Sequence, residues 1–272
     1  MKGPIAVFDS GYGGLTVLNK IRQHLPEYDY VYLGDNARTP YGTRSFEVVY
    51  EYTLEAVKKL FDMGAHLVIL ACNTASAKAL RNIQQKDLPQ IDPDRRVLGV
   101  IRPSVEKVNE LSQSKHVGIF GTVGTVKSES YSIEINKLFP DVIVTQEACP
   151  MWVPLVENNE FKYDGADYFI KQHTDRLQQK DPKIDTIILG CTHYPLLADK
   201  IQRYLADGIK LIEQGDIVAE SLKDYLNRHP EMDLKCSKKG TVHFYTTEQE
   251  EKFKQTAGIF FEGELNVEHV TL

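Results

Sequence analysis

Short apolar runs alternate with amphipathic segments along almost the whole chain. Several of these runs are rich in β-branched residues and apolar at consecutive positions, which is typical of strands covered on both faces of a parallel sheet. Their regular alternation with helical patterns predicts an α/β fold with mostly parallel sheets. The expected strands are residues 4–9, 29–34, 67–71, 97–101, 116–120, 142–146, 186–190, 209–213 and 241–245.

The clearest helical pattern runs from Ser45 to Met63. Its apolar side chains form one stripe at helical spacing, and Gly64 follows as a C-terminal stop signal. A helix with this pattern packs its apolar face on a sheet and leaves the other face in water. Further helices are expected over residues 15–24, 75–85, 103–113, 126–138, 164–179, 196–206, 216–228 and 248–256.

Two kinds of strand ending each occur twice. The stretches IAVFDSGYGGLT (5–16) and VGIFGTVGTVKS (117–128) end a strand in a turn of glycine and hydroxyl residues. The stretches LVILACNTAS (67–76) and TIILGCTHYP (186–195) end a strand in cysteine and then polar residues. This repetition predicts two pseudo-symmetric α/β domains, and if they face each other, Cys72 and Cys191 approach one small ligand from opposite sides. The first domain is expected to comprise residues 1–97 plus 210–272, and the second residues 98–209.

Composition and charge narrow the classes of function. The 272-residue chain has 32 Lys and Arg against 38 Asp and Glu, a net charge of −6, and its basic residues are scattered. This distribution argues against nucleic-acid and anionic-membrane partners. No apolar run approaches the length of a membrane span, and the N-terminal MKGPIAVFDSG contains no secretory signal. The expected location is therefore the cytoplasm, where thiols stay reduced.

Unusual polar residues gather where the predicted strands end. Ligands of parallel α/β sheets bind beyond the carboxyl ends of the strands, so these residues are expected at the ligand edge. Hydroxyl, amide and backbone N–H groups at helix starts suit small carboxylates, whereas the glycines complete neither common phosphate-binding motif. The residues concerned are Asp9, Ser10, Asp35, Cys72, Asn73, Thr74, Thr122, Thr125, Cys191, Thr192 and His193.

The four cysteines divide into two pairs. A free cysteine is more often a packing residue than a catalytic one, and that interpretation is adopted for Cys149 and Cys236. Cys72 and Cys191 differ, because each ends a strand and precedes hydroxyl or amide residues. Helix N-terminal N–H groups at such a position lower the pKa of a thiol. The matched pair is therefore interpreted as chemically active.

Residues near the two cysteines admit alternative roles. His193 lies in a C-x-H arrangement, but no further ligand motif accompanies it, so proton transfer is favoured over zinc binding. Asp9 either caps the following helix or handles a proton near Cys72. Tyr41 lies between proline and glycine and is otherwise a turn residue. Glu157 is either a helix-start carboxylate or a titrating group.

Six motifs together resemble those of the glutamate racemases, a cofactor-independent family that makes D-glutamate for bacterial peptidoglycan. They occur in the same order and extend over most of the chain, which makes the resemblance specific. Aspartate racemases share the two-cysteine plan, but the extended set is closer to the glutamate enzymes. The motifs are DSGxGGLTVL (9–18), GDxxxxPYG (34–42), ACNTAS (71–76), GVIxP (99–103), CPxxVPLVE (149–157) and GCTHYPLL (190–197).

The resemblance implies two mostly parallel α/β domains with the active site in the cleft between them, and it implies roles for individual residues. Cys72 takes the Cα proton from D-glutamate with help from Asp9, and Cys191 takes it from L-glutamate with help from His193. Neither a cofactor nor a metal is implied, and this family commonly forms homodimers. Arg102 departs from the family pattern, in which related sequences often carry an acidic residue. The residues matching substrate-binding positions are Ser10, Tyr41, Gly42, Asn73, Thr74, Thr122 and Thr192, with Asp35 and Glu157 at supporting acidic positions.

The chemistry of racemisation is consistent with a pair of thiols. Removing a weakly acidic Cα proton and returning one to the opposite face requires two flanking groups, one a thiolate and the other a thiol. Three alternatives remain: an aspartate racemase, a hydrolase using Cys191 and His193 on an acyl substrate, and a catalytically silent module that binds a small dicarboxylate. The hydrolase leaves the Cys72 motif without a role.

Overall fold

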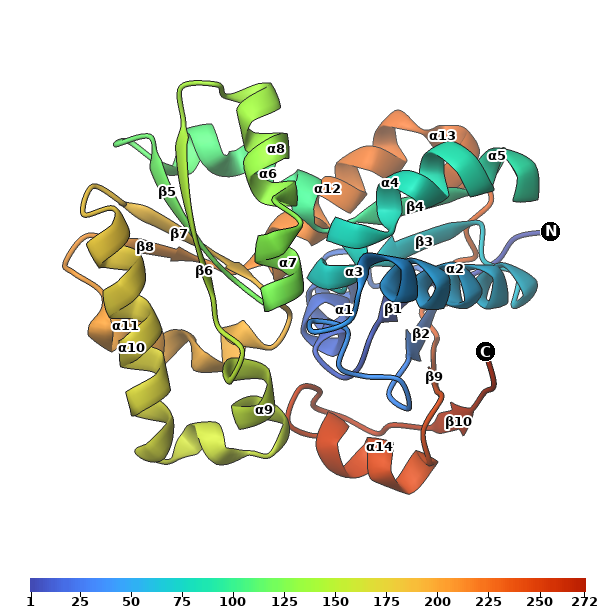
Figure 1. Cartoon of the computed structure of the whole chain (residues 1–272). Coiled ribbons are helices and arrows are strands. Elements are labelled where there is room, and N and C mark those ends of the chain that lie inside the picture. Colours follow the sequence, from blue (N-terminus) through green and yellow to red (C-terminus); the bar gives the residue numbers. More distant parts are fainter.

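The computed structural model describes residues 1–272 and contains two α/β domains side by side (Figure 1). Every strand pair within the two sheets is parallel. The first sheet has six strands in the order β10 (Val267–His269), β9 (Val242–Thr246), β2 (Tyr30–Gly34), β1 (Ile5–Asp9), β3 (Leu67–Leu70) and β4 (Arg96–Gly99). The second has four, in the order β6 (Ile143–Ala148), β5 (His116–Gly121), β7 (Thr186–Gly190) and β8 (Lys210–Ile212).

Helices connect these strands and cover the sheets. With the six-stranded sheet pack α1 (Gly14–His24), α2 (Phe46–Asp62), α3 (Asn73–Lys78), α4 (Leu80–Asn82), α5 (Leu88–Ile91), α12 (Gln214–Arg228), α13 (Pro230–Asp233) and α14 (Glu250–Ala257). With the four-stranded sheet pack α6 (Ile101–Leu111), α7 (Val123–Lys127), α8 (Ser130–Leu138), α9 (Trp152–Glu157), α10 (Gly165–Lys180) and α11 (Ala198–Tyr204). Two parallel-sheet domains of this kind confirm the predicted fold class. None of the helices has both the length and the apolar character needed to cross a membrane.

The chain passes between the domains twice, and the boundaries expected from sequence need correction. The expected limit after residue 97 falls inside β4, all of which belongs to the six-stranded sheet. The expected return at residue 210 assigned β8 to the first domain, but β8 pairs with β7 in the four-stranded sheet. The crossings therefore follow β4 and β8. Each strand is only three or four residues long, and its partner sheet is a long-range choice that local pattern does not encode.

Two of the expected helices are interrupted. The helix expected over residues 75–85 is divided into α3 and α4 and continues as a π-helical turn over Ile83–Asp87. The helix expected over 126–138 is divided into α7 and α8, because Glu129 adopts a left-handed φ of 53° between them. Hydrophobic spacing continues across both breaks, which explains why the pattern alone predicts single helices.

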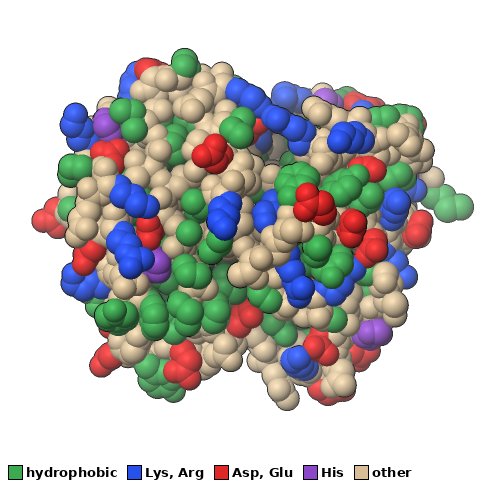
Figure 2. All heavy atoms as spheres, in the orientation of Figure 1, with side chains coloured by type: hydrophobic (Ala, Val, Ile, Leu, Met, Phe, Trp, Pro, Cys, Tyr) green, Lys and Arg blue, Asp and Glu red, His purple; other side chains and the backbone are tan.

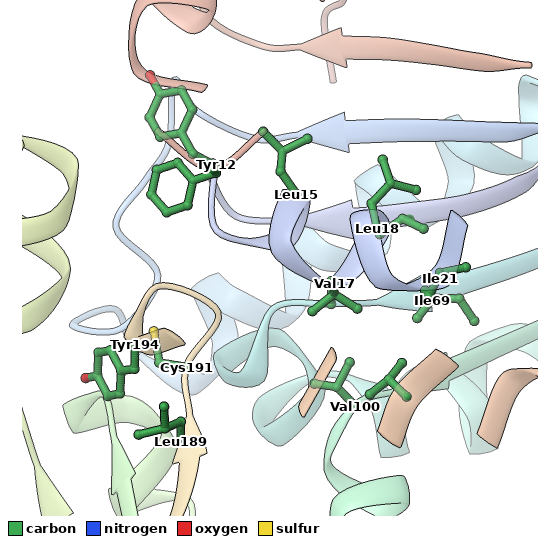
Figure 3. Close-up of a cluster of buried hydrophobic side chains, with 14 of the residues drawn as sticks. Tyr12, Leu15, Val17, Leu18, Ile21, Ile69, Val100, Leu189, Cys191 and Tyr194 are labelled. Atoms are coloured by element: carbon green, nitrogen blue, oxygen red, sulfur yellow. The ribbon is translucent and has the colours of Figure 1, made fainter. Parts of the chain in front are cut away.

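Helix α1 links the cores of the two domains. It packs against α12, and its Leu15, Leu18 and Ile21 side chains are fully buried (Figure 3). The same apolar cluster continues to Leu189 and Tyr194 of the second domain. Figure 3 shows these two residues close to Cys191, at the end of β7. The domains are therefore joined by a shared apolar core as well as by the two crossings.

Candidate active site

Strand β3 places Cys72 at the start of α3. All four β3 residues are buried, and Cys72 occupies the N-cap position with extended backbone. Its sulfur accepts a hydrogen bond from the Ala75 amide at 3.4 Å and lies 3.3 Å from the Ser10 hydroxyl oxygen. A short polar side chain at the N-cap satisfies a free N–H of the first helical turn. The cysteine thus has a fixed position at the edge of the sheet.

Burial strongly disfavours charge on Cys72. The pKa of its thiol is raised to about 12, chiefly because the group is buried and secondly because Asp9 lies nearby. Charge on Cys191 also raises this pKa, whereas the hydrogen bonds from Ser10 and Ala75 lower it. Burial likewise raises the pKa of Asp9, against the opposing effect of His193. Cys72 is therefore a neutral thiol near pH 7.

The second cysteine has a cationic neighbour instead. Cys191 follows β7, and its sulfur lies 3.9 Å from His193 Nδ1, while Nε2 of the same ring lies 2.9 Å from the Glu157 carboxylate. Burial lowers the pKa of His193, but the contacts with Cys191 and Glu157 outweigh it and raise that pKa to about 10. His193 is therefore an imidazolium near pH 7, and it places a positive charge beside the Cys191 sulfur.

The two strand ends face each other across the domain boundary. The Thr192 hydroxyl donates to Asp9 at 3.5 Å, and the Thr74 and Thr122 hydroxyl oxygens are 3.0 Å apart. Gly13 lies so close to the second domain that an added Cβ would be 2.2 Å from Thr192 Oγ1. These contacts bring the surroundings of Cys72 together with those of Cys191, as the strand repetition predicts.

The loop carrying Tyr41 and Gly42 closes against the second domain. The Gly42 carbonyl accepts a hydrogen bond from the Gly124 amide at 2.7 Å, and an added Cβ on Gly42 would lie 2.9 Å from Thr122 Cβ. Only a glycine permits this approach of one domain to the other. The loop therefore lies beside the hydroxyls at the start of α7.

Asp35 orients Tyr41. Its buried carboxylate accepts a hydrogen bond from the Tyr41 hydroxyl, one from Arg38 Nε at 2.7 Å and one from the Thr247 hydroxyl at 2.9 Å. Burial and the charge of Asp35 raise the pKa of Tyr41, so the phenol stays protonated. Asp35 is thus a support for the loop, while Glu157 contacts the histidine directly.

Arg102 lies apart from both cysteines. It is half-exposed on α6, where it pairs with Glu106 at 2.7 Å and with Glu134 at 3.4 Å. It lines a cavity of about 630 Å³ between the domains, and neither cysteine lines that cavity. Figure 2 shows a hollow between the two halves with Lys and Arg side chains at its rim. The departure from the family pattern therefore concerns this groove and leaves the surroundings of the cysteines unchanged.

The nucleophilic and acidic side chains are not arranged as a metal centre. No group of three or more His, Cys, Asp and Glu side chains is placed to hold a metal ion. Cys149 and Cys236 are buried and form no disulfide, which is consistent with their interpretation as packing residues.

Comparison with known proteins identifies the family. Residues 14–222 match the model of the Asp/Glu/hydantoin racemases. This chain belongs to that family. A glutamate racemase from Roseobacter denitrificans is 41% identical over 238 residues, which are 84% of this chain and 87% of the relative. The resemblance drawn from the six motifs is therefore confirmed, and the chain is an amino-acid racemase by family.

Solved structures agree with this assignment. Glutamate racemase RacE1 from Bacillus anthracis has a TM-score of 0.90 at 32% identity, covering 99% of this chain and 98% of that one. The Francisella tularensis glutamate racemase in complex with D-glutamate has a TM-score of 0.88 at 31% identity, with the same coverage. An aspartate racemase from Picrophilus torridus shares the fold alone, with a TM-score of 0.53 at 16% identity over 84% of this chain and 95% of that one.

Two buried residues of the racemase were missed by the sequence reasoning. The Asn73 amide donates to Gln214 Oε1 at 2.8 Å and accepts from the Tyr131 hydroxyl at 2.7 Å. Gln214 begins α12, and Tyr131 lies in the first turn of α8. Gln214 closely follows strand β8, and a position after a strand is the signal that identified the other polar site residues. Tyr131 gave no local signal, because an aromatic residue at helical spacing is normally a core residue.

Proposed function

We propose that this protein interconverts L- and D-glutamate without a cofactor, using Cys72 and Cys191 as the two proton-transferring groups. The observation that carries the proposal is the matched placement of two thiols in oppositely biased surroundings. Cys72 lies beside Asp9 with its pKa raised to about 12, whereas Cys191 lies beside the His193 imidazolium. A two-base racemase needs one thiol and one thiolate on opposite faces of Cα, and the two cysteines have an acidic and a cationic neighbour respectively.

In the direction from L- to D-glutamate, the Cys191 thiolate removes the Cα proton and the Cys72 thiol donates its own proton to the opposite face. The turnover leaves Cys191 as a thiol and Cys72 as a thiolate, so the number of protons on the enzyme is unchanged. That product form is the one that accepts D-glutamate, and the reverse reaction restores the starting form. Asp9 and His193 assist by holding or releasing protons next to their respective cysteines.

The hydroxyl and amide groups between the domains suit the charges of glutamate. Thr122 caps α7 and Cys72 caps α3, so backbone N–H groups and side-chain donors converge from two short helices. Fixed donors of this kind stabilise negative charge that builds up on the α-carboxylate as the Cα proton leaves. We assign substrate binding to Ser10, Tyr41, Gly42, Asn73, Thr74, Thr122 and Thr192, with Asp35 and Glu157 in support.

The proposed activity is accompanied by a proposed biological role, location and assembly. D-glutamate made by this reaction supplies peptidoglycan synthesis, and we place the enzyme in the cytoplasm, where its four free cysteines stay reduced. The proposed binding partner is the small-molecule substrate, and neither nucleic acid nor a membrane is proposed as a partner. The proposed assembly is a homodimer.

The alternatives differ in what they leave unexplained. A Cys–His hydrolase uses Cys191 and His193 but gives no role to Cys72 and Asp9. An aspartate racemase uses both cysteines, but the relatives described above that match at 31–41% identity are glutamate racemases. A silent binding module has no need for two buried thiols with charged partners.

Incubation of the purified protein with each enantiomer of glutamate and of aspartate in D₂O tests the proposal. We expect the optical rotation of either glutamate enantiomer to decay to zero while deuterium appears at Cα. Comparable racemisation of aspartate would support the aspartate alternative. Binding of glutamate without any inversion or deuterium incorporation would overturn the proposal.

A further inference from the structure

Three buried side chains form a closed ring of hydrogen bonds next to Cys72. Asn73 Nδ2 donates to Gln214 Oε1 at 2.8 Å, Gln214 Nε2 donates to the Tyr131 hydroxyl at 2.8 Å, and that hydroxyl donates to Asn73 Oδ1 at 2.7 Å. All three residues are at least 95% buried. Each member both donates and accepts, and such a cycle is stronger than its separate bonds because each bond polarises the next.

A backbone carbonyl fixes the direction of this ring. Reversing both amides would give a second closed ring, with the Gln214 oxygen facing outward. Gln214 Nε2, however, lies 3.2 Å from the Val100 carbonyl and 2.7 Å from the Ser104 hydroxyl, which itself donates to that carbonyl at 3.1 Å. A carbonyl accepts only, so the amide nitrogen of Gln214 must face it. The orientation of the Asn73 amide follows from this constraint.

The ring also lies where the chain crosses between domains. Val100 lies in the first crossing, between β4 and α6, and Ser104 lies in the first turn of α6. Gln214 begins α12 immediately after the second crossing. Tyr131 belongs to the second domain and Asn73 to the first. The side-chain amide of Gln214, which follows the second crossing, therefore hydrogen-bonds both Val100 in the first crossing and Asn73, the residue after Cys72.

The ring leaves one N–H of Asn73 uncommitted. A side-chain amide has two N–H donors, and Gln214 occupies one of them, while Asn73 makes no further side-chain hydrogen bond beyond that with Tyr131. Burial and, less strongly, the charge of Cys191 raise the pKa of the Tyr131 hydroxyl, so the ring also lies near the second thiol. The free N–H thus has a defined direction beside Cys72.

We propose that Gln214 and Tyr131 are positioning residues that orient the Asn73 amide so that its free N–H binds a carboxylate of the substrate. This inference rests on the proposed glutamate racemisation and deepens it. It assigns a role in substrate affinity to two residues outside the six sequence motifs. It also predicts that the affinity for substrate depends on the geometry of the domain crossings.

Steady-state kinetics of Tyr131→Phe and Ser104→Ala test the proposal. Tyr131→Phe breaks two bonds of the ring and leaves the Asn73 amide held only by its bond to Gln214. With its orientation loosened in this way, KM for both glutamate enantiomers should rise about tenfold, the effect of losing an oriented hydrogen bond to a charged group. The value of kcat should change much less. Ser104→Ala is the matched control, because it removes a buried hydroxyl bonded to Gln214 and leaves the ring closed. Its KM should stay within about twofold of wild type, a change too small to represent a lost hydrogen bond.

A double-mutant cycle separates positioning from general damage. Once Asn73 is replaced by alanine, adding Tyr131→Phe should cause no further rise in KM. Additive effects of the two substitutions, or equal KM values for Tyr131→Phe and Ser104→Ala, would overturn the proposal. Should Tyr131→Phe fail to fold, Gln214→Leu opens the ring from the other side and is judged by the same two comparisons. Lack of glutamate racemisation by the wild-type protein would instead refute the proposed function.

Discussion

His193 Nε2 donates a hydrogen bond to the Glu157 carboxylate over 2.9 Å, while Nδ1 of the same ring faces the Cys191 sulfur at 3.9 Å. The ring also packs edge-on against Phe260, with 5.1 Å between the ring centroids. An imidazolium uses both nitrogens as donors, and both have a partner that carries or can carry negative charge.

The raised pKa of His193 predicts that stability falls at alkaline pH. The pKa in the folded protein is about 10 against an ordinary value of 6.5, so protonation of this residue favours the folded state. Its contribution is complete below about pH 6.5 and is lost as the pH rises through about 10. Urea denaturation across this range should show a decline in the free energy of unfolding. The decline should be smaller in Glu157→Gln, which removes one cause of the raised pKa and costs about 2 kcal/mol near pH 7. Identical pH profiles for the two proteins would contradict this account.

Removing one cysteine should separate proton exchange from inversion. Cys72→Ala and Cys191→Ala should each lower racemisation by about 10²- to 10⁴-fold, because each loses one proton-transferring group. In D₂O, Cys72→Ala retains the thiol on the L-glutamate side and should still exchange the Cα proton of L-glutamate. Cys191→Ala should exchange that of D-glutamate. Proton NMR of the recovered amino acid measures both. Exchange of the same enantiomer by both variants would contradict the assigned faces.

Two glycines of one turn provide a matched pair of variants. A Cβ on Gly13 would lie 2.2 Å from Thr192 Oγ1 and 2.5 Å from His193 Nδ1, whereas a Cβ on Gly11 would have no neighbour nearer than 3.5 Å. Gly13→Ala must therefore displace the second-domain residues by about 1 Å and should lower kcat/KM about 100-fold. Gly11→Ala should lower it by less than about fivefold, since ordinary van der Waals contact costs little. Equal activities of the two variants in a chiral chromatography assay would rule out this close domain contact.

The charge of Asp9 should be detectable through the reactivity of Cys72. Asp9 raises the pKa of this thiol, so Asp9→Asn should lower it and increase the thiolate fraction at a given pH. The test compares rates of iodoacetamide alkylation against pH in the Cys191→Ala background, with modification of Cys72 followed by peptide mass spectrometry. A rate profile that moves to higher pH, or does not move, would contradict the proximity of the two groups.

Because the reaction interconverts two enantiomers, the kinetic constants of its two directions can be checked against each other for every variant. The two enantiomers have equal free energies in water, so kcat/KM must be equal in the two directions for any form of the enzyme. Tyr131→Phe and Gly13→Ala can therefore change kcat and KM separately for each enantiomer but must keep the two ratios equal. Unequal ratios after purification would identify a contaminating activity.

The sequence predicts those residues of the candidate site that directly follow a strand. Cys72 and Cys191 each follow a fully buried strand, and the preference for ligand sites at such positions singled them out. The same reasoning found Asp9 and His193. It did not find helix α9, because Pro154 normally argues against a helix; here proline occupies the first turn, where its missing N–H is not needed.

The sequence by itself determined the alternation of strands and helices, the placement of polar residues at strand ends and the family of the chain, because these depend on local hydrophobic period and on motifs. Only the tertiary structure decided that β8 belongs to the second sheet, that Glu157 pairs with His193, and that Gln214 and Tyr131 enclose Asn73. The physical reason is that strand pairing, burial and hydrogen-bond geometry join residues far apart in the chain. The raised pKa values of Cys72 and His193 depend on burial and on those same long-range contacts.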